Sequence, residues 1–262
     1  MKLSLENKKA VVCGSTQGIG MAVAEELAML GAEITLIARN EHRLEEVRDN
    51  LVITKGQNHD YIVADFRQPE DLKTKIGAYL QEGHRPVILV NNTGGPAGGP
   101  IIDATYEQFN ETLTAHLHCN HILAQALVPG MKEANYGRII NIISTSVKQP
   151  IQGLGVSNTV RGAVASWAKT LSLELAKYGI TVNNVLPGFT NTVRLDYIIT
   201  TKANKTGLSK EEVIDEMKSQ CPARRFGDPA EVASVAAFLA SPSAGYVNGT
   251  SIPVDGGRTG SI

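Results

Sequence analysis

The chain has 262 residues, a length that suits one α/β domain with a sizeable buried core. Its 25 basic and 26 acidic side chains give a net charge of −1, which offers no electrostatic reason to expect nucleic acid or a membrane surface as a partner. Its three cysteines, at positions 13, 119 and 221, are too few and too uneven in number for a disulfide framework, so we expect a cytoplasmic protein.

Seven short apolar segments follow one another along the chain and are typical of buried strands. They are rich in Val and Ile throughout instead of alternating with polar residues, which predicts parallel strands covered on both faces. The expected strands are 10–13, 34–38, 61–64, 87–90, 138–143, 181–186 and 251–254. No apolar stretch reaches the length of a signal peptide or a membrane span.

Segments with helical spacing separate these strands. Apolar residues recur at that spacing in 19–30, 44–51 and 156–178. The alternation predicts a doubly wound, Rossmann-type, seven-stranded parallel sheet, and the absence of linkers predicts one domain over residues 1–262. The polar segment 190–220 contains a short helical patch around residues 211–217. We expect the segment to form a small lid over a ligand cleft.

Residues 13–20, CGSTQGIG, follow the first expected strand and open the first expected helix. Glycines at 14, 18 and 20 allow a tight turn and a close approach of the backbone to a pyrophosphate, and the amides at the helix start point at the anion. The spacing G-x-x-x-G-x-G differs from the dehydrogenase pattern G-x-G-x-x-G. An ordinary tight strand–helix connection is the alternative, although the position after the first strand favours a phosphate cradle.

The second expected strand ends in Ala38 and Arg39 instead of an acidic residue. An acidic side chain there accepts hydrogen bonds from an adenosine 2′-hydroxyl and favours NAD. Arg39 suits a 2′-phosphate through a charge-assisted contact, so the sequence favours NADP over NAD. The alternative is that Arg39 is a solvated surface charge.

Five motifs in chain order resemble those of the short-chain dehydrogenase/reductase superfamily, and the resemblance extends over nearly the whole chain. The motifs are CGSTQGIG (13–20), VADF (63–66), NNTG (91–94), GRIINIIS (137–144) and PGFTNT (187–192). The later run PARRFGDPAEVASVAAFLASP is similar to β-ketoacyl-acyl-carrier-protein-reductase-like members. The resemblance implies that Asp65 contacts the adenine, that Ser144 orients the substrate and that Thr192 holds the nicotinamide carboxamide.

The resemblance also implies the remaining cofactor contacts and the partners. The residues expected at the cofactor are Gly14, Ser15, Thr16, Gln17, Gly18, Ile19, Gly20, Arg39, Asp65, Phe66, Asn92, Thr93, Gly94, Arg161, Pro187, Gly188 and Thr192. The implied substrate is a small carbonyl or alcohol compound, and a 3-oxoacyl thioester is one candidate. Family members commonly form tetramers through the helices after strands four and five, which implies a homotetramer.

The catalytic positions depart from the family pattern of Asn, Ser, Tyr and Lys. Only Ser144 matches; the Tyr position holds Ser157, the Lys position holds Arg161 and the Asn position holds His116. Ser157 and Arg161 are four residues apart, so they share one face of the long helix. We therefore treat these four residues as the candidate catalytic set.

The substitutions leave the proton donor open. Arg161 can bind a nicotinamide ribose, but a guanidinium does not relay protons. The Ser157 hydroxyl is a poor acid and ends about 4 Å short of the reach of a tyrosine, a gap that one water molecule can fill. His116 either donates the proton or takes over the hydrogen bonds of the structural Asn, and Lys148 either swings inward or remains solvated.

The histidine-rich run HLHCNH, residues 116–121, predicts no metal site. On a helix His116 and His118 do not share a face, and no carboxylate or second cysteine completes a ligand set.

The leading hypothesis is an NADP(H)-dependent carbonyl reductase with an altered proton path. The alternatives are a nucleotide-binding sensor or regulatory protein without turnover, and a protein that binds no ligand and acts through its surfaces.

Overall fold

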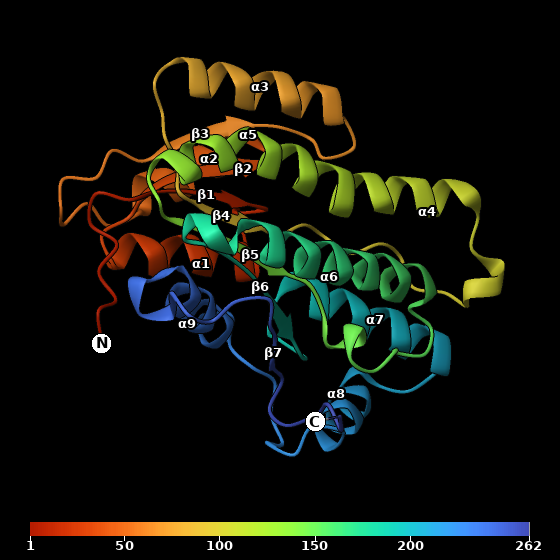
Figure 1. Cartoon of the computed structure of the whole chain (residues 1–262). Coiled ribbons are helices and arrows are strands. Elements are labelled where there is room, and N and C mark those ends of the chain that lie inside the picture. The colour runs from red at the N-terminus through yellow and green to blue at the C-terminus, as the bar shows by residue number, and fades with distance from the viewer. Residues whose placement is uncertain (262) are drawn as a thin grey trace.

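A computed structural model describes residues 1–261 and contains one parallel sheet in the order β3-β2-β1-β4-β5-β6-β7 (Figure 1). The strands are β1 (Lys9–Cys13), β2 (Glu33–Ala38), β3 (Asp60–Val63), β4 (Ile88–Asn91), β5 (Gly137–Ile142), β6 (Ile180–Pro187) and β7 (Ser251–Val254). Each predicted strand is present, with ends that differ by at most one residue, so the doubly wound fold is confirmed. The order reverses between β1 and β4, and sheets of this kind bind ligands at such a switch point.

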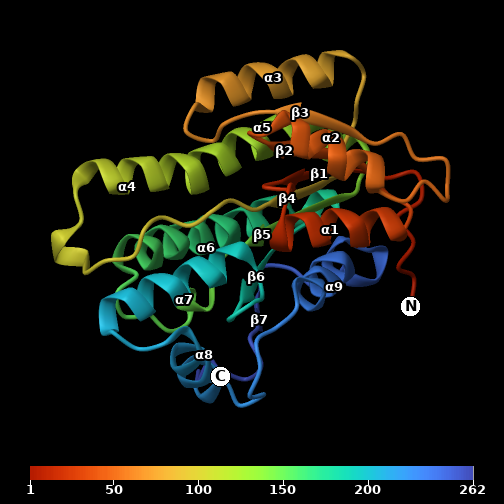
Figure 2. The same cartoon turned by 180° about the vertical axis from the view of Figure 1, so that it is seen from behind.

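Helices cover both faces of the sheet (Figures 1 and 2). They are α1 (Gly18–Met29), α2 (Glu41–Asn50), α3 (Pro69–Gln81), α4 (Tyr106–Leu113), α5 (Cys119–Glu133), α6 (Gly155–Leu175), α7 (Val193–Thr206), α8 (Lys210–Ser219) and α9 (Pro229–Ala240). Apolar residues of α1, α2 and α9 share one buried cluster, and those of α3, α5 and α6 share another on the opposite face. This division explains why the strands are apolar on both sides.

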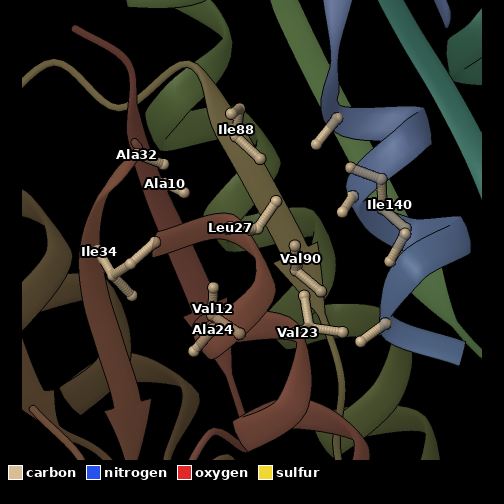
Figure 3. Packing of buried hydrophobic residues seen from close by; sticks show 14 of the residues in the cluster. Ala10, Val12, Val23, Ala24, Leu27, Ala32, Ile34, Ile88, Val90 and Ile140 are labelled. Atoms are coloured by element: carbon tan, nitrogen blue, oxygen red, sulfur yellow. The ribbon is translucent and has the colours of Figure 1, made fainter. Parts of the chain in front are cut away.

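The helix that follows the glycine-rich loop is fixed to the sheet by its apolar face. Val23 and Leu27, four residues apart on α1, are fully buried in the cluster that holds Val12 of β1 and Val90 of β4 (Figure 3). Val12 and Val90 are paired across the two strands. Burial of one such side chain stabilises the fold by about 1.5–3 kcal/mol, so this contact holds the start of α1 firmly over the switch point.

The segment 190–220 contains more helix than the sequence predicts. The expected short patch is the helix α8, but the polar run before it forms the additional fourteen-residue helix α7. Leu195 and Ile199 lie on one face of α7 and pack with Val213 and Met217 of α8 in a small cluster of their own. The sequence of α7 has few apolar residues, and they stand among threonines and charged residues. Their helical spacing is therefore hard to recognise. The pair lies on the side of the molecule away from α3 (Figures 1 and 2).

Between α4 and α5 the chain forms a π-helical segment, Thr114–His118, instead of a continuous α-helix. Such bulges are frequent at functional sites, and this one places His116 in the buried interior. Over residues 1–261 the structure holds no group of three His, Cys, Asp or Glu side chains arranged for a metal ion. None of the described helices combines the length and apolarity that a membrane span needs.

Candidate active site

A cavity of about 860 Å³ opens at the carboxyl edge of the sheet. Its wall includes residues that directly follow β1 to β5, so it lies at the switch point between β1 and β4. Of the residues expected at the site, those that line it are Gly14, Thr16, Gln17, Gly18, Ile19, Arg39, Asp65, Phe66, Asn92, Thr93, Gly94, His116, Ser144, Ser157, Arg161, Pro187, Gly188 and Thr192. One continuous space thus joins the glycine-rich loop to the candidate catalytic residues.

Two residues expected at the cofactor do not line this space. Ser15 is fully buried, and its hydroxyl donates a 3.5 Å hydrogen bond to the carbonyl of Ile37. A Cβ atom on Gly20 would overlap the carbonyl oxygen of Gly14 and lie 2.6 Å from Nδ2 of Asn92. Ser15 and Gly20 therefore lie on the side of the loop away from the cavity. The first turn of α1 packs so closely on Gly14 that Gly20 has no room for a side chain.

The glycine-rich loop has the geometry of a phosphate cradle. Gly14 and Gly18 adopt φ values of +58° and +56°, a region that side-chain-bearing residues rarely occupy. Gln17 at the N-cap of α1 makes no side-chain capping bond, so the first amides of that helix are available to an anion. Asn92 braces the loop, since its Nδ2 donates to the carbonyls of Cys13 and Gly14, each at 3.2 Å. This arrangement fits the pyrophosphate of a dinucleotide.

At the other end of the cradle lies a positively charged group of side chains. Arg39 and Arg67 both line the cavity beside Asp65. Nη2 of Arg67 donates to Oδ2 of Asp65 at 2.6 Å, and this pairing lowers the pKa of the carboxyl below its ordinary value. The sequence prediction missed Arg67, although its place two residues after Asp65 in VADFR could have indicated it. Two cations on one wall fit the extra phosphate of NADP.

Ser144 lies two residues after the end of β5 and lines the cavity. Its hydroxyl also forms a hydrogen bond within the turn that follows. Its Oγ accepts a hydrogen bond of 3.1 Å from the backbone N–H of Ser146. The hydroxyl proton remains free to donate, so Ser144 can still bind a substrate carbonyl. Ser157 lies one helical turn before Arg161 on α6, and all three line the same cavity. Lys148 is exposed and outside it.

His116 connects the π-helical segment to the loop that follows β4. It is 4% exposed, and its Nε2 donates to the carbonyl of Gly94 at 3.1 Å. Burial, with the positive charge of Arg161 as a second cause, lowers the pKa of His116 to about 3. The ring is therefore neutral at pH 7 and poorly suited to donate a proton, and this favours the interpretation that it replaces the hydrogen bonds of an Asn.

Two arginines, Arg161 and Arg194, line the cavity near the candidate catalytic residues. Arg161 is 8% exposed, and its Nη1 donates to the carbonyl of Ile142 at 3.3 Å. Arg194, which the sequence prediction missed, donates from Nη2 to the carbonyl of Pro96 at 2.6 Å. Its only signal in the sequence is its position two residues after Thr192. It joins α7 to the loop after β4 across the cavity.

Comparisons with known proteins agree with this geometry. The family model described as enoyl-(acyl carrier protein) reductase matches residues 14–259. A granaticin polyketide synthase putative ketoacyl reductase from Streptomyces violaceoruber is 34% identical over 95% of this chain and 92% of its own length. The 3-oxoacyl-[acyl-carrier-protein] reductase FabG of Vibrio cholerae is 32% identical over 97% of this chain and 98% of its own.

Solved structures extend the likeness to three dimensions. L-sorbose reductase from Gluconobacter frateurii, complexed with NADPH and L-sorbose, superimposes with a TM-score of 0.93 at 30% identity, covering 100% of both chains. YwfH, an NADPH-dependent reductase of bacilysin biosynthesis, gives 0.91 at 28% identity over 97% of this chain and 99% of its own. The chain therefore belongs to the short-chain dehydrogenase/reductase superfamily and is an oxidoreductase of that family that resembles the ketoacyl reductases.

Proposed function

We propose that this chain is an NADP(H)-dependent reductase of a small carbonyl compound, built as a single nucleotide-binding domain over residues 1–262. The carrying observation is the continuous cavity that joins the glycine cradle to Ser144 and Arg161. NADP is supported by Arg39 and Arg67 at the adenosine end and by relatives whose names specify NADPH. The ketoacyl reductases among the relatives support a ketone or a 3-oxoacyl thioester as substrate.

When bound, NADPH would supply a hydride to the carbonyl carbon. The Ser144 hydroxyl would donate a hydrogen bond to the carbonyl oxygen and stabilise its developing negative charge. His116 stays neutral and holds the loop through Gly94. Ser157 lies on the cavity wall, where its short side chain would hold a water molecule that relays a proton from solvent to the carbonyl oxygen.

The cofactor contacts follow from the same wall. The amides at the start of α1 and the glycine turn would hold the pyrophosphate, Asp65 would contact the adenine, and Arg161 would donate to the nicotinamide ribose. Thr192 caps α7, because its Oγ1 accepts from the N–H of Leu195 at 3.3 Å, and this fixes it beside Gly18 for contact with the carboxamide.

The protein acts in the cytoplasm as a homotetramer. Two features support assembly through α5 and α6. Leu173 of α6 is a large apolar side chain that is 71% exposed and that an interface through this helix would cover. Trp167 of α6 donates from Nε1 to Nδ1 of His121 on α5 at 3.3 Å, which holds the two helices in one surface.

The test is a comparison of NADPH and NADH binding to the purified full chain, run beside NADPH oxidation with aldehydes, ketones, oxo acids and 3-oxoacyl thioesters. We expect NADPH to bind at least tenfold more tightly than NADH and to be oxidised with one class of carbonyl. Tight binding without oxidation across the panel would support the sensor instead. No binding of either dinucleotide would leave only a protein that acts through its surfaces.

A further inference from the structure

Two guanidinium groups from separate helices converge on one point of the cavity. A Cβ atom placed on Gly95 would lie 3.6 Å from Nη2 of Arg161 and 3.7 Å from Nη2 of Arg194. Arg161 belongs to α6 and Arg194 to the first turn of α7. Because Gly95 lines the cavity as well, both cations face the same space.

No side chain within residues 1–261 neutralises this pair of charges. The guanidinium of Arg161 donates to the main-chain oxygen of Ile142, and that of Arg194 donates to the main-chain oxygen of Pro96. Within residues 1–261 neither group forms an ion pair with a carboxylate. Main-chain carbonyls hold both groups in place and leave their remaining N–H donors for a ligand.

The acidic groups of the cavity wall act elsewhere. Asp65 pairs with Arg67 and, with the further charge of Glu111, raises the pKa of that guanidinium. In contrast, burial and then the like charge of Arg194 lower the pKa of Arg161 to about 10, so Arg161 is still charged at pH 7. A buried cation is costly without a counter-charge, and a second cation beside it adds repulsion. An anion between the two arginines removes both costs.

We propose that Arg161 and Arg194 bind a carboxylate of the substrate, and that the substrate is a small 2-oxo or 3-oxo acid and not a thioester. Planar guanidinium groups match a carboxylate through paired, charge-assisted hydrogen bonds. Arg161 lies one turn from Ser157, so a carboxylate held there is close to the reacting carbonyl. The carbonyl carbon gains a hydride from NADPH and its oxygen gains a proton from water, which yields a hydroxy acid and NADP⁺.

This inference rests on the proposed reductase function, and paired probes separate the two. The probes are 2-oxobutanoate and 3-oxobutanoate, each compared with its neutral methyl ester, in NADPH oxidation and in thermal-shift binding to the NADP⁺ complex. The variants are Arg194→Gln, Arg194→Lys and the control Lys205→Gln, which removes the same charge from the same helix outside the cavity. Affinity for NADPH is measured for every variant.

We expect the wild-type protein to bind at least one oxo acid tenfold or more tightly than its ester. Arg194→Gln weakens binding of that acid at least tenfold and changes ester and NADPH binding less than threefold, whereas Arg194→Lys restores part of the acid binding and Lys205→Gln changes nothing. Equal binding of acid and ester, or a loss of NADPH affinity alone in Arg194→Gln, overturns the carboxylate site. Arg194-dependent acid binding without NADPH oxidation upholds the site and contradicts the reductase function.

Discussion

Two exchanged side chains define the chemistry of this site at the scale of single residues. Ser157 and Arg161 stand where the resembled family has Tyr and Lys, and both line the cavity. The swap removes the phenol that commonly donates the proton and keeps a cation. A guanidinium stabilises charge without relaying protons, so the exchange favours binding of an anion over rapid proton transfer.

Restoring the family pair tests whether only the acid is missing. The double variant Ser157→Tyr with Arg161→Lys should raise kcat for a neutral ketone by about 10²-fold or more, because a positioned general acid typically contributes that much. Steady-state NADPH oxidation measures it, with each single variant as a control. Unchanged kcat in a double variant that still binds NADPH would show that the geometry around Ser144 also differs from the family.

His116 makes the free energy of unfolding depend on pH, because burial lowers the pKa of its ring. Its pKa in the folded protein, about 3, lies below the ordinary value of 6.5, so the unfolded chain takes up the proton first. This contribution is complete above pH 6.5 and is lost as the pH falls toward 3. His116→Asn should therefore flatten the pH dependence of the unfolding free energy between pH 6 and 4, by at most about 1.4 kcal/mol per pH unit.

Urea unfolding at several pH values measures this slope. His42→Asn is the matched control, since the His42 side chain is 78% exposed and forms its contact with Glu46 at the surface. An identical slope in wild type and His116→Asn would mean that the ring of His116 titrates normally in the folded protein, and would return it to the list of proton donors.

At the scale of elements, the site depends on how α1 and α7 meet the strand ends. The N-terminus of α1 is uncapped beside the glycine turn. Thr192 is the N-cap of α7, and its Cγ2 would lie 3.1 Å from a Cβ on Gly18. The cradle therefore touches the helix that carries Arg194. Cofactor and substrate ends of the cavity are connected through this contact.

Gly18→Ala tests that contact. The left-handed φ at Gly18 costs a side-chain-bearing residue about 1–2 kcal/mol, and the added methyl group presses on Thr192. We expect at least tenfold weaker NADPH binding by calorimetry and a lower Tm. Gly77→Ala in the open middle of α3 should instead stabilise the protein by about 0.5–1 kcal/mol and leave binding unchanged. Equal NADPH affinity in both variants would contradict a phosphate cradle at this loop.

At the scale of the whole molecule, the proposed tetramer places the layer of α5 and α6 at the interface. That layer carries the exposed Leu173. Leu173→Asp should reduce a tetramer to smaller species, measured as mass by light scattering after gel filtration, because it places a charge in an apolar interface. Ile53→Asp, on the loop after α2 and 60% exposed, should leave the mass unchanged. A wild-type mass equal to that of one chain would contradict the tetramer.

The sequence by itself determined the parts that depend on local pattern. Val- and Ile-rich strands between amphipathic helices fix a parallel sheet covered on both faces, and the glycine spacing after β1 fixes a tight turn with positive φ values, because both follow from the preferences of neighbouring residues. The same local rules failed for α7, whose helix depends on packing against α8. Those rules also do not show that Ser15 is buried and that Gly20 packs against Gly14, since both depend on what lies behind the loop.

Only the tertiary structure decided what stands opposite the cofactor. His116 reaches Gly94 over 22 residues of chain, and Arg194 reaches Pro96 over 98. Such pairings depend on how the loop after β4 meets the π-helical segment and α7 in space, and no periodicity in the sequence encodes that. The convergence of Arg161 and Arg194 at Gly95, and with it the preference for an anionic substrate, belongs to the fold because separate helices bring those charges together.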